Sequence, residues 1–306
     1  MTISFADQVA IITGAGRGLG RQYALDIAAR GGAIVVADIG RDQTSGTAWA
    51  ETVVAEIEAK GGRAVAATDS VATSEGGRTV VDVAMDTFGR LDGLVHNAGF
   101  MRPGYFDELS DDEIRDVVDV HVMGAFHIGR PAWKWMKQGQ YGRIVLTSSG
   151  AIFGYHASTN YAAAKAALIG LTTALANEGA EYGIQANAIL PFAQSAIGKD
   201  NPVPGSSMGM LADKLARNQH RWGPDSVSPL VTYLASAECK ISGRAYSAVA
   251  GRYARIALAA GNGWLASPEQ FTAEAVSEHF NEIDCLADTS HPASMVDELQ
   301  QVLDRL

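Results

Sequence analysis

Cysteine is scarce in this chain, with only Cys239 and Cys285 among 306 residues, and neither stands near other metal-binding side chains. This scarcity argues against a disulfide scaffold and against a zinc site, and it favours a reducing compartment. No apolar run approaches the roughly 20 residues of a membrane span, and the first residues lack the pattern of a signal peptide. We therefore expect a cytoplasmic protein with no metal ion and no membrane partner.

Positive charge is also in short supply. Lysine and arginine together number 24, against 34 aspartates and glutamates, which gives a formal net charge of −10. Such an acidic balance argues against a nucleic-acid partner. With 47% hydrophobic residues, 19% charged residues and 33 glycines, the composition is that of a globular protein long enough for a large core. The partner that we expect is a small-molecule substrate.

Short apolar runs alternate with longer amphipathic stretches, which is the pattern of repeated β-α-β units. The predicted strands are residues 9–13, 33–38, 64–68, 94–96, 143–148, 185–190 and 244–249. The predicted helices are residues 18–30, 44–60, 75–88, 110–137, 160–182 and 225–237. The fourth helix opens with a capping box of Ser110 and Glu113. The sequence therefore predicts an α/β fold of the Rossmann type, a doubly wound parallel seven-stranded sheet with helices on both faces.

Residues 1–251 are predicted to form a single dinucleotide-binding catalytic domain. Within it, residues 192–224 lose periodicity and collect Gly, Pro, Ser and Met, as expected of a substrate loop. Residues 252–306 have helical patterning and are predicted to form a C-terminal extension packed on the same domain. No chemistry can be assigned to this extension from its sequence.

A glycine-rich segment, residues 13–20 (TGAGRGLG), stands where the first predicted strand meets the first predicted helix. Glycines at such a turn let the backbone approach a pyrophosphate, which the N–H groups of the helix N-terminus then bind. The alternative is a tight turn that needs positive φ, and such a turn does not require four glycines. We expect a dinucleotide site whose contacts include Gly14, Arg17, Gly18, Leu19 and Gly20.

Asp38 ends the second predicted strand, beyond the glycine-rich segment. A carboxylate there accepts hydrogen bonds from the adenosine ribose and repels a 2′-phosphate, which favours NAD over NADP. Arg17 favours the opposite choice, because its guanidinium could pair with a 2′-phosphate. We expect the nearer Asp38 to decide for NAD, with Ile39 beside it in the cofactor site. The alternative for Asp38 is a residue that caps the end of the strand.

Tyr161 and Lys165 stand four residues apart in a predicted helix and therefore share one helix face. A phenol has a pKa of about 10 by itself, and a nearby ammonium group lowers that pKa toward the working range of a base. Ser148, thirteen residues before Tyr161, could orient a substrate oxygen against the phenol. Ser149 competes for this position, and the thirteen-residue spacing favours Ser148. Taken alone, a Tyr-x-x-x-Lys pair is usually an ordinary contact on a helix surface.

These features occur together with Asn97-Ala98-Gly99, and the combination resembles the short-chain dehydrogenase/reductase family over about residues 5–250. Within that family, residues 119–133 and 141–149 resemble the (3R)-hydroxyacyl-CoA dehydrogenase domain of peroxisomal multifunctional enzyme type 2 and its bacterial relatives. Residues 250–280 resemble that domain loosely.

The resemblance implies a role for each matching residue. Tyr161 would be the general acid/base, Lys165 would lower its pKa and hold the nicotinamide ribose, and Ser148 would hydrogen-bond the reacting oxygen. The further cofactor contacts that it implies are Asp69 and Ser70 beside the adenine, Asn97, Ala98 and Gly99 beside the adenosine ribose, and Pro191 beside the nicotinamide.

Two residues depart from the family pattern. His121 stands in the long predicted helix where many members have asparagine. It is a catalytic candidate because an imidazole could join a water relay to Lys165, and a packing role is an equal alternative. Phe192 replaces the glycine that commonly follows Pro191, which alters the expected shape of the nicotinamide pocket.

We expect an NAD-dependent enzyme that interconverts a secondary alcohol and a ketone, acting on a 3-hydroxyacyl-CoA or a similarly bulky apolar substrate. A hydroxysteroid or small-alcohol dehydrogenase is the first alternative, and a non-catalytic NAD-binding scaffold is the second. The residues expected to line an apolar pocket are Phe153, Tyr155, Met208, Met210 and Trp222. Small residues around positions 162–167, together with the family's use of such helices between subunits, predict a homodimer or homotetramer.

Overall fold

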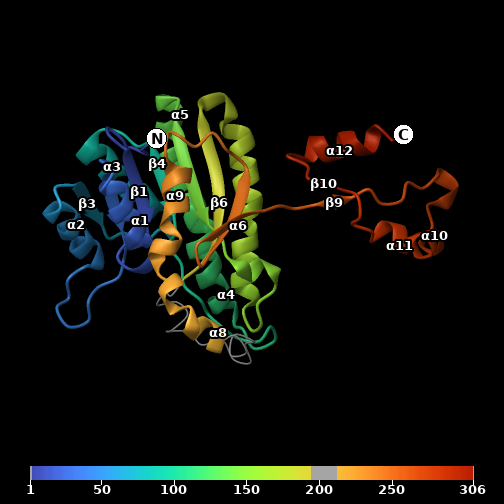
Figure 1. Cartoon of the computed structure of the whole chain (residues 1–306), viewed down its shortest axis with the longest axis horizontal. Coiled ribbons are helices and arrows are strands. Elements are labelled where there is room, and N and C mark those ends of the chain that lie inside the picture. The colour runs from blue at the N-terminus through green and yellow to red at the C-terminus, as the bar shows by residue number, and fades with distance from the viewer. Residues whose placement is uncertain (1, 194–211, 306) are drawn as a thin grey trace. The chain divides into compact units, whose positions relative to one another are not determined.

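The computed structural model describes residues 2–193 and 212–305. The chain divides into two compact units, Met1–Arg255 and Ile256–Leu306 (Figure 1). Every residue predicted for catalysis or cofactor binding belongs to the first unit, so the fold of that unit determines the site.

An eight-stranded sheet organises the first unit, in the spatial order β3-β2-β1-β4-β5-β6-β7-β8. Its strands are β1 (Val9–Thr13), β2 (Ala33–Ala37), β3 (Arg63–Ala67), β4 (Gly93–His96), β5 (Gly142–Thr147), β6 (Ile184–Phe192), β7 (Arg244–Val249) and β8 (Arg252–Ile256). The first seven strands pair in parallel, which confirms the predicted Rossmann-type sheet. The strand order reverses between β1 and β4. Open sheets of this kind bind ligands at the carboxyl ends of the strands beside such a reversal.

The eighth strand adds to the seven that the sequence predicts. Ala250 and Gly251 connect β7 to β8 with φ angles of 54° and 81°. Two consecutive positive φ angles are typical of a type I′ hairpin turn, which joins antiparallel strands. The sheet therefore continues beyond residue 251, and the first unit ends at Arg255 instead of at the predicted domain boundary.

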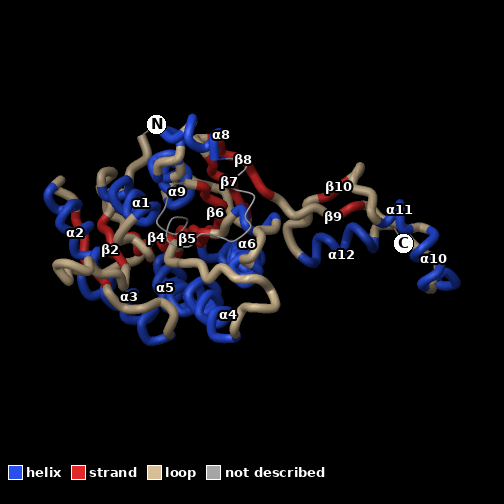
Figure 2. Tube along the Cα trace, turned by 90° about the horizontal axis from the view of Figure 1, so that it is seen from below, coloured by secondary structure: helices blue, strands red, loops and turns tan. Residues whose placement is uncertain are grey.

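Helices cover both faces of the sheet, as predicted (Figure 2). On one face lie α1 (Gly18–Ala28), α2 (Trp49–Ala59) and α9 (Ser228–Ala235), and on the other lie α3 (Ser74–Phe88), α5 (Gly124–Gly139) and α6 (Thr159–Gly179). Each face has its own hydrophobic core. Because both faces are covered, β1 and β2 are buried at every position, and this explains their uninterrupted apolar sequences.

Helix α2 begins at Trp49, later than the predicted start at residue 44. The Asp42 side chain accepts hydrogen bonds from the backbone N–H groups of Thr44 and Ser45 at 3.0 and 2.7 Å, and Gly46 follows with a φ of 73°. An aspartate that bonds nearby backbone in this way offers the chain an alternative to helix. The segment before Trp49 therefore forms a loop beside the predicted cofactor site.

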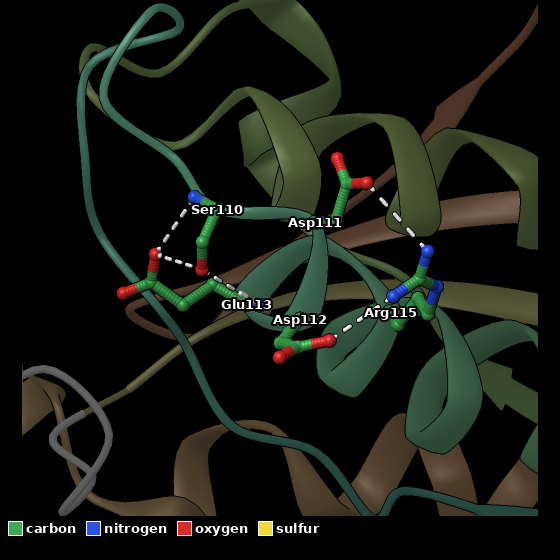
Figure 3. A network of polar contacts seen from close by, with 5 residues as sticks. All are labelled: Ser110, Asp111, Asp112, Glu113 and Arg115. Atoms are coloured by element: carbon green, nitrogen blue, oxygen red, sulfur yellow. Dashed lines mark hydrogen bonds and ion pairs between the residues drawn. The ribbon is translucent and has the colours of Figure 1, made fainter.

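The long helix predicted at residues 110–137 forms in three parts. The first, α4 (Asp111–Val118), opens with the predicted capping box, in which Ser110 and Glu113 each bond the other's backbone (Figure 3). A π-helical turn, η1 (Asp119–Met123), then leads into α5. Turns of this kind inside helices are frequent at functional sites, and this one contains the buried His121.

The structure describes part of the predicted substrate loop. Its second half contains α8 (Ala212–Arg217) and a 3₁₀ turn at Gln219–Arg221, where the sequence predicts no regular structure. A further 3₁₀ turn at Pro224–Ser226 lies at the junction with the next predicted helix. Met208 and Met210 lie outside the described residues. The helix predicted at residues 225–237 is confirmed as α9, although it is shorter at both ends.

The described part of the second unit combines short helices with a two-stranded antiparallel sheet. Its elements are β9 (Ala260–Gly261), α10 (Ala273–Glu278), α11 (Phe280–Ile283), β10 (Thr289–Ser290) and α12 (Met295–Leu303). Trp264 stacks on His279 within it, with ring centroids 4.1 Å apart. The helical pattern predicted for this segment is confirmed and its two strands were not predicted. The packing of this extension on the catalytic domain stays a prediction.

Candidate active site

The predicted phosphate loop connects β1 to α1. Gly14 and Gly18 adopt φ angles of 63° and 56°, a conformation that favours glycine. Gly20 has a different constraint, since a Cβ there would lie 2.2 Å from the Gly14 carbonyl oxygen. A Cβ on Gly18 would meet nothing within 4 Å, so the loop is open on that side. The N-terminus of α1 has no side-chain cap, which leaves N–H groups for a pyrophosphate, and the loop therefore fits a dinucleotide.

Asp38 follows β2, and two backbone amides orient its carboxylate. The Gly16 N–H donates to Oδ2 at 2.8 Å and the Gly40 N–H donates to Oδ1 at 2.7 Å. Asp38 therefore caps this turn, which was the alternative considered for it. Each carboxylate oxygen retains a further lone pair for a ribose hydroxyl, so the capping role does not displace the predicted cofactor role. Ile39 is 65% exposed beside it, an apolar surface suited to an adenine ring.

Asn97 contacts the phosphate loop itself. Its side-chain Nδ2 donates to the carbonyl oxygens of Thr13 and Gly14, both at 3.2 Å. The backbone N–H groups of Asn97 and Ala98 both donate to Thr13 Oγ1 at 3.0 Å. Asn97 therefore holds the phosphate loop in shape. The resemblance implies only a position beside the adenosine ribose, so this structural role was not predicted.

The other predicted cofactor residues follow strands at the same edge of the sheet. Asp69 is exposed and Ser70 is half-buried, and both come just after β3. The Ser70 Oγ accepts a hydrogen bond from the Ala72 N–H at 3.3 Å, which shapes the turn there. Leu19 is half-buried in the first turn of α1, and Pro191 lies near the end of β6.

Tyr161 and Lys165 lie in α6 and are 9% and 3% exposed. The Lys165 Nζ is 5.6 Å from the centroid of the Tyr161 ring. It donates a hydrogen bond at 2.6 Å to the carbonyl oxygen of Thr147, a residue that is not among those predicted for the site. Burial lowers the pKa of Lys165 to about 7. The Lys165 side chain is therefore held at the end of β5, and it can gain or lose its charge near neutral pH.

Burial raises the pKa of Tyr161 above its ordinary value, while a hydrogen bond with the Ser149 side chain acts in the opposite direction. The expectation that Lys165 would lower this pKa is wrong for the structure as it stands. Both groups are removed from water, and the Lys165 ammonium is directed to Thr147. At neutral pH the raised pKa keeps the Tyr161 phenol protonated, whereas Lys165 can gain or lose its proton near pH 7.

Ser149, and not the predicted Ser148, makes the hydrogen bond with Tyr161. The Ser148 hydroxyl is buried and donates to the backbone carbonyl of Lys165 at 2.7 Å. Ser149 has the extended angles φ −160° and ψ 155°, and successive side chains of an extended segment point to opposite sides. Ser148 therefore faces the backbone of α6, and Ser149 faces the phenol. The thirteen-residue spacing could not distinguish the two sides of the chain.

His121 is fully buried beside Tyr161, with ring centroids 5.3 Å apart in an edge-on arrangement. Its Nε2 lies 2.8 Å from the Phe100 carbonyl oxygen and 3.2 Å from the Phe100 N–H, and we assign it as the donor in the shorter contact. Nδ1 is then an acceptor, and no partner for it occurs in the described part of the chain. Burial, followed by the charge of Lys165, lowers the pKa of His121 and keeps it neutral.

Gly99 makes room for this imidazole, because a Cβ there would lie 2.2 Å from His121 Cε1. The fit supports the packing role considered for His121. The unpartnered Nδ1 offers an acceptor for the relay that was the other alternative.

The residues expected to line a substrate pocket divide between two places. Tyr155 packs against the small core cluster that contains Tyr161, and Phe153 is 70% exposed on the turn after β5. Trp222 makes an edge-on contact with Phe192, with ring centroids 5.3 Å apart. Phe192, which replaces the glycine that is common in the family, therefore contacts the described second part of the substrate loop.

A model of the family described as short chain dehydrogenase matches residues 8–196. The chain belongs to the short-chain dehydrogenase family. It is 42% identical over 261 residues to a short-chain type dehydrogenase/reductase of Mycobacterium tuberculosis, with 84% of this chain and 87% of that protein covered. It is 36% identical over 299 residues to peroxisomal multifunctional enzyme type 2 of Mus musculus, with 96% of this chain and 39% of that protein covered.

The solved structure of full-length peroxisomal multifunctional enzyme type 2 from Drosophila melanogaster matches with a TM-score of 0.79 and 30% identity. The match covers 99% of this chain and 50% of that one, so this chain spans half or less of the two multifunctional proteins. The family establishes a dehydrogenase/reductase that acts on CH–OH groups with NAD or NADP. The choice of NAD, the substrate, the oligomeric state and the cytoplasmic location stay predictions.

Within residues 2–193 and 212–305, no helix is long and apolar enough to cross a membrane. The same residues contain no group of three or more histidine, cysteine or carboxylate side chains placed to hold a metal ion.

Proposed function

We propose that this chain is an NAD-dependent dehydrogenase that interconverts a secondary alcohol and a ketone, with Tyr161 as the general acid/base. The observation that carries this proposal is the Tyr161 hydroxyl, which is buried with a serine hydroxyl bonded to it and a lysine of pKa about 7 close by. The group stands after β5, on the same edge of the sheet as the phosphate loop.

Bound NAD would supply the hydride acceptor that oxidation of an alcohol needs. The protein's own residues handle the proton and the oxygen. Ser149 donates to the substrate oxygen and stabilises the charge that develops on it, an effect of about 3–4 kcal/mol for such donors in other enzymes. With Lys165 as an ammonium, loss of the Tyr161 proton to solvent leaves a phenolate close to a positive charge, which stabilises it. That phenolate takes the proton of the alcohol, and the phenol returns it in the reverse reaction.

Asp38 supports the choice of NAD. Its carboxylate is fixed by the amides of Gly16 and Gly40 at the place where an adenosine ribose would lie. A 2′-phosphate there would face this negative charge at short range, whereas the two ribose hydroxyls can donate to it.

For the substrate we propose a 3-hydroxyacyl-CoA or a similarly bulky apolar alcohol. The motif resemblance supports this class, and so do two aromatic side chains: Tyr155, which packs against the cluster that contains Tyr161, and Trp222, which contacts Phe192. A hydroxysteroid or small-alcohol dehydrogenase is the alternative within enzymes. The alternative of another class, a non-catalytic NAD-binding scaffold, does not account for a buried tyrosine that is bonded to a serine and paired with a buried lysine.

The test measures reduction of NAD by absorbance over a panel of 3-hydroxyacyl-CoAs, hydroxysteroids and short secondary alcohols. Tyr161→Phe is compared with the unaltered chain, since it removes the phenol oxygen and keeps the ring. We expect turnover on one class and a loss of at least 10³-fold in Tyr161→Phe. Equal turnover in the two proteins would rule out the mechanism. NAD binding without turnover on any substrate would favour the scaffold.

We also propose that the chain forms a homodimer or homotetramer. The helices α4, η1 and α5 expose large apolar side chains, and α6 carries small residues that permit close helix packing. The exposed side chains are Ile114, Met123, Phe126 and Trp135. A mass near 32.2 kDa in light scattering would contradict an oligomer.

A further inference from the structure

Trp49, the first residue of α2, lies against the adenosine end of the proposed cofactor site. The Arg17 guanidinium lies over its indole, with Cζ 4.3 Å from the ring centroid. A Cβ on Gly40 would lie 2.1 Å from Trp49 Cε3, and a Cβ on Gly16 would lie 2.6 Å from Trp49 Cβ. The two glycines therefore let Trp49 lie directly on the phosphate loop and on the turn after β2.

The same two glycines orient Asp38. Their backbone N–H groups donate to the two oxygens of its carboxylate, at 2.8 Å from Gly16 and 2.7 Å from Gly40. Trp49 packs on these residues while Asp38 accepts their hydrogen bonds. The indole, the carboxylate and the guanidinium thus form one small cluster, in which Arg17 is exposed and Asp38 is half-buried.

This cluster brings together the two residues that favour opposite cofactors. An exposed arginine in the phosphate loop, free to turn toward the ribose, would pair with a 2′-phosphate and offset the repulsion from Asp38. A guanidinium on an aromatic face is held there by the ring, and arginine is the cation found most often in such contacts. A residue of α2, outside the phosphate loop, therefore helps to position Arg17.

We propose that Trp49 is a positioning residue for cofactor selectivity, because its indole holds the Arg17 guanidinium away from a 2′-phosphate and so lets Asp38 select NAD. This inference rests on the proposed function of the glycine loop as a dinucleotide site. Trp49 acts through Arg17, so its effect appears only in ligands that differ at the 2′ position.

The test titrates the full-length protein with NAD and with NADP by calorimetry, so that binding is measured without any substrate. The decisive variant is Trp49→Leu, which keeps bulk against Gly16 and Gly40 and removes the aromatic face. We expect it to shift the ratio of the two dissociation constants at least fivefold toward NADP. Trp49→Phe, which keeps an aromatic face, should retain the original ratio within about twofold. Adding Arg17→Gln to Trp49→Leu should return the ratio to its original value.

An unchanged ratio in Trp49→Leu, or a shift toward NAD, would overturn the inference, and the second result would mean that Trp49 presents Arg17 to the phosphate. If Trp49→Leu does not fold, Arg17→Gln alone decides, since Arg17 is exposed. We expect that variant to change the ratio by less than threefold, and a tenfold loss of NADP binding would contradict the proposal. Failure of both cofactors to bind the unaltered protein would instead refute the dinucleotide site itself.

Discussion

The Ser148 hydroxyl donates to the backbone carbonyl of Lys165 at 2.7 Å and so joins the end of β5 to the middle of α6. This bond has a consequence for the proposed chemistry. A hydroxyl that is buried and committed to a backbone carbonyl is a poor partner for a substrate oxygen. The neighbouring Ser149 is half-buried and bonded to Tyr161, so it is the serine placed for that role.

Ser148→Ala and Ser149→Ala form a matched pair that tests this assignment. Each substitution removes a hydroxyl that makes a hydrogen bond to the backbone, since the Ser149 hydroxyl accepts one from the Ala151 N–H at 3.1 Å. Each should therefore cost about 1 kcal/mol of stability. We expect Ser149→Ala to lower kcat about 10²–10³-fold and Ser148→Ala to lower it less than tenfold. Steady-state kinetics and chemical denaturation of both variants give the comparison. The opposite order of kcat losses would restore Ser148 as the reacting serine.

Lys165→Met should stabilise the protein while it abolishes turnover. Burial lowers the pKa of Lys165 from 10.5 to about 7, so the folded state disfavours its charged form. A shift of this size corresponds to several kcal/mol, part of which the bond to the Thr147 carbonyl recovers. We expect Lys165→Met to raise the free energy of unfolding by about 1–3 kcal/mol at pH 6, measured by urea denaturation.

The pH dependence of this gain gives a second check. Between pH 7 and 10.5 the unfolded state holds a proton on Lys165 that the folded state has lost, so stability rises with pH across that window. The difference between Lys165→Met and the unaltered protein should therefore be largest below pH 7 and shrink as the pH rises. Lys134→Met, at an exposed lysine, is the control and should change stability by no more than about 0.5 kcal/mol. A gain that does not vary with pH would mean that packing, and not charge burial, is responsible.

Gly99→Ala should be destabilising through His121. The added Cβ would lie 2.2 Å from His121 Cε1, so the buried ring must move, and overpacking of this kind costs about 1–3 kcal/mol. In a His121→Ala background the same change should cost at least 1 kcal/mol less, because the ring is gone. A double-mutant cycle of unfolding free energies measures this coupling, and additive effects would contradict it.

Much of the fold could be predicted because its signals are local. The glycine loop, the buried strands and the capping box of Ser110 and Glu113 each depend on residues adjacent in sequence, and each is confirmed. The strand β8 was missed because its hairpin turn uses Ala250 at a φ of 54°, and alanine gives no sign of such a turn. The start of α2 was missed because the hydrogen bonds of Asp42 outweigh the helical pattern around it.

The site was harder to predict in the details that depend on tertiary structure. Helix spacing correctly placed Tyr161 and Lys165 together, but the direction of the Tyr161 pKa depends on burial, which spacing does not report. The choice between Ser148 and Ser149 depends on where β5 ends and on which side each residue faces. Trp49 belongs to no sequence motif. Only its contacts with Arg17 and Gly40 show that it lies at the cofactor site.

His96 should make the protein sensitive to acid. It is 1% exposed, its Nδ1 lies 3.2 Å from Thr13 Oγ1, and burial is the largest cause that lowers its pKa from 6.5 to about 4. As the pH falls from 6.5 toward 4, the unfolded chain gains a proton on His96 that the folded protein does not. The stability that the neutral ring provides is therefore complete above pH 6.5 and is lost across that window, an effect on the order of 3 kcal/mol. The His96 Nε2 also lies 3.2 Å from the His121 carbonyl oxygen. His96→Gln should be less stable at pH 7, because Gln cannot repeat both ring contacts, and its stability should fall less steeply between pH 6.5 and 4. Urea denaturation at a series of pH values measures the two slopes, and equal slopes would show that His96 does not drive the acid response.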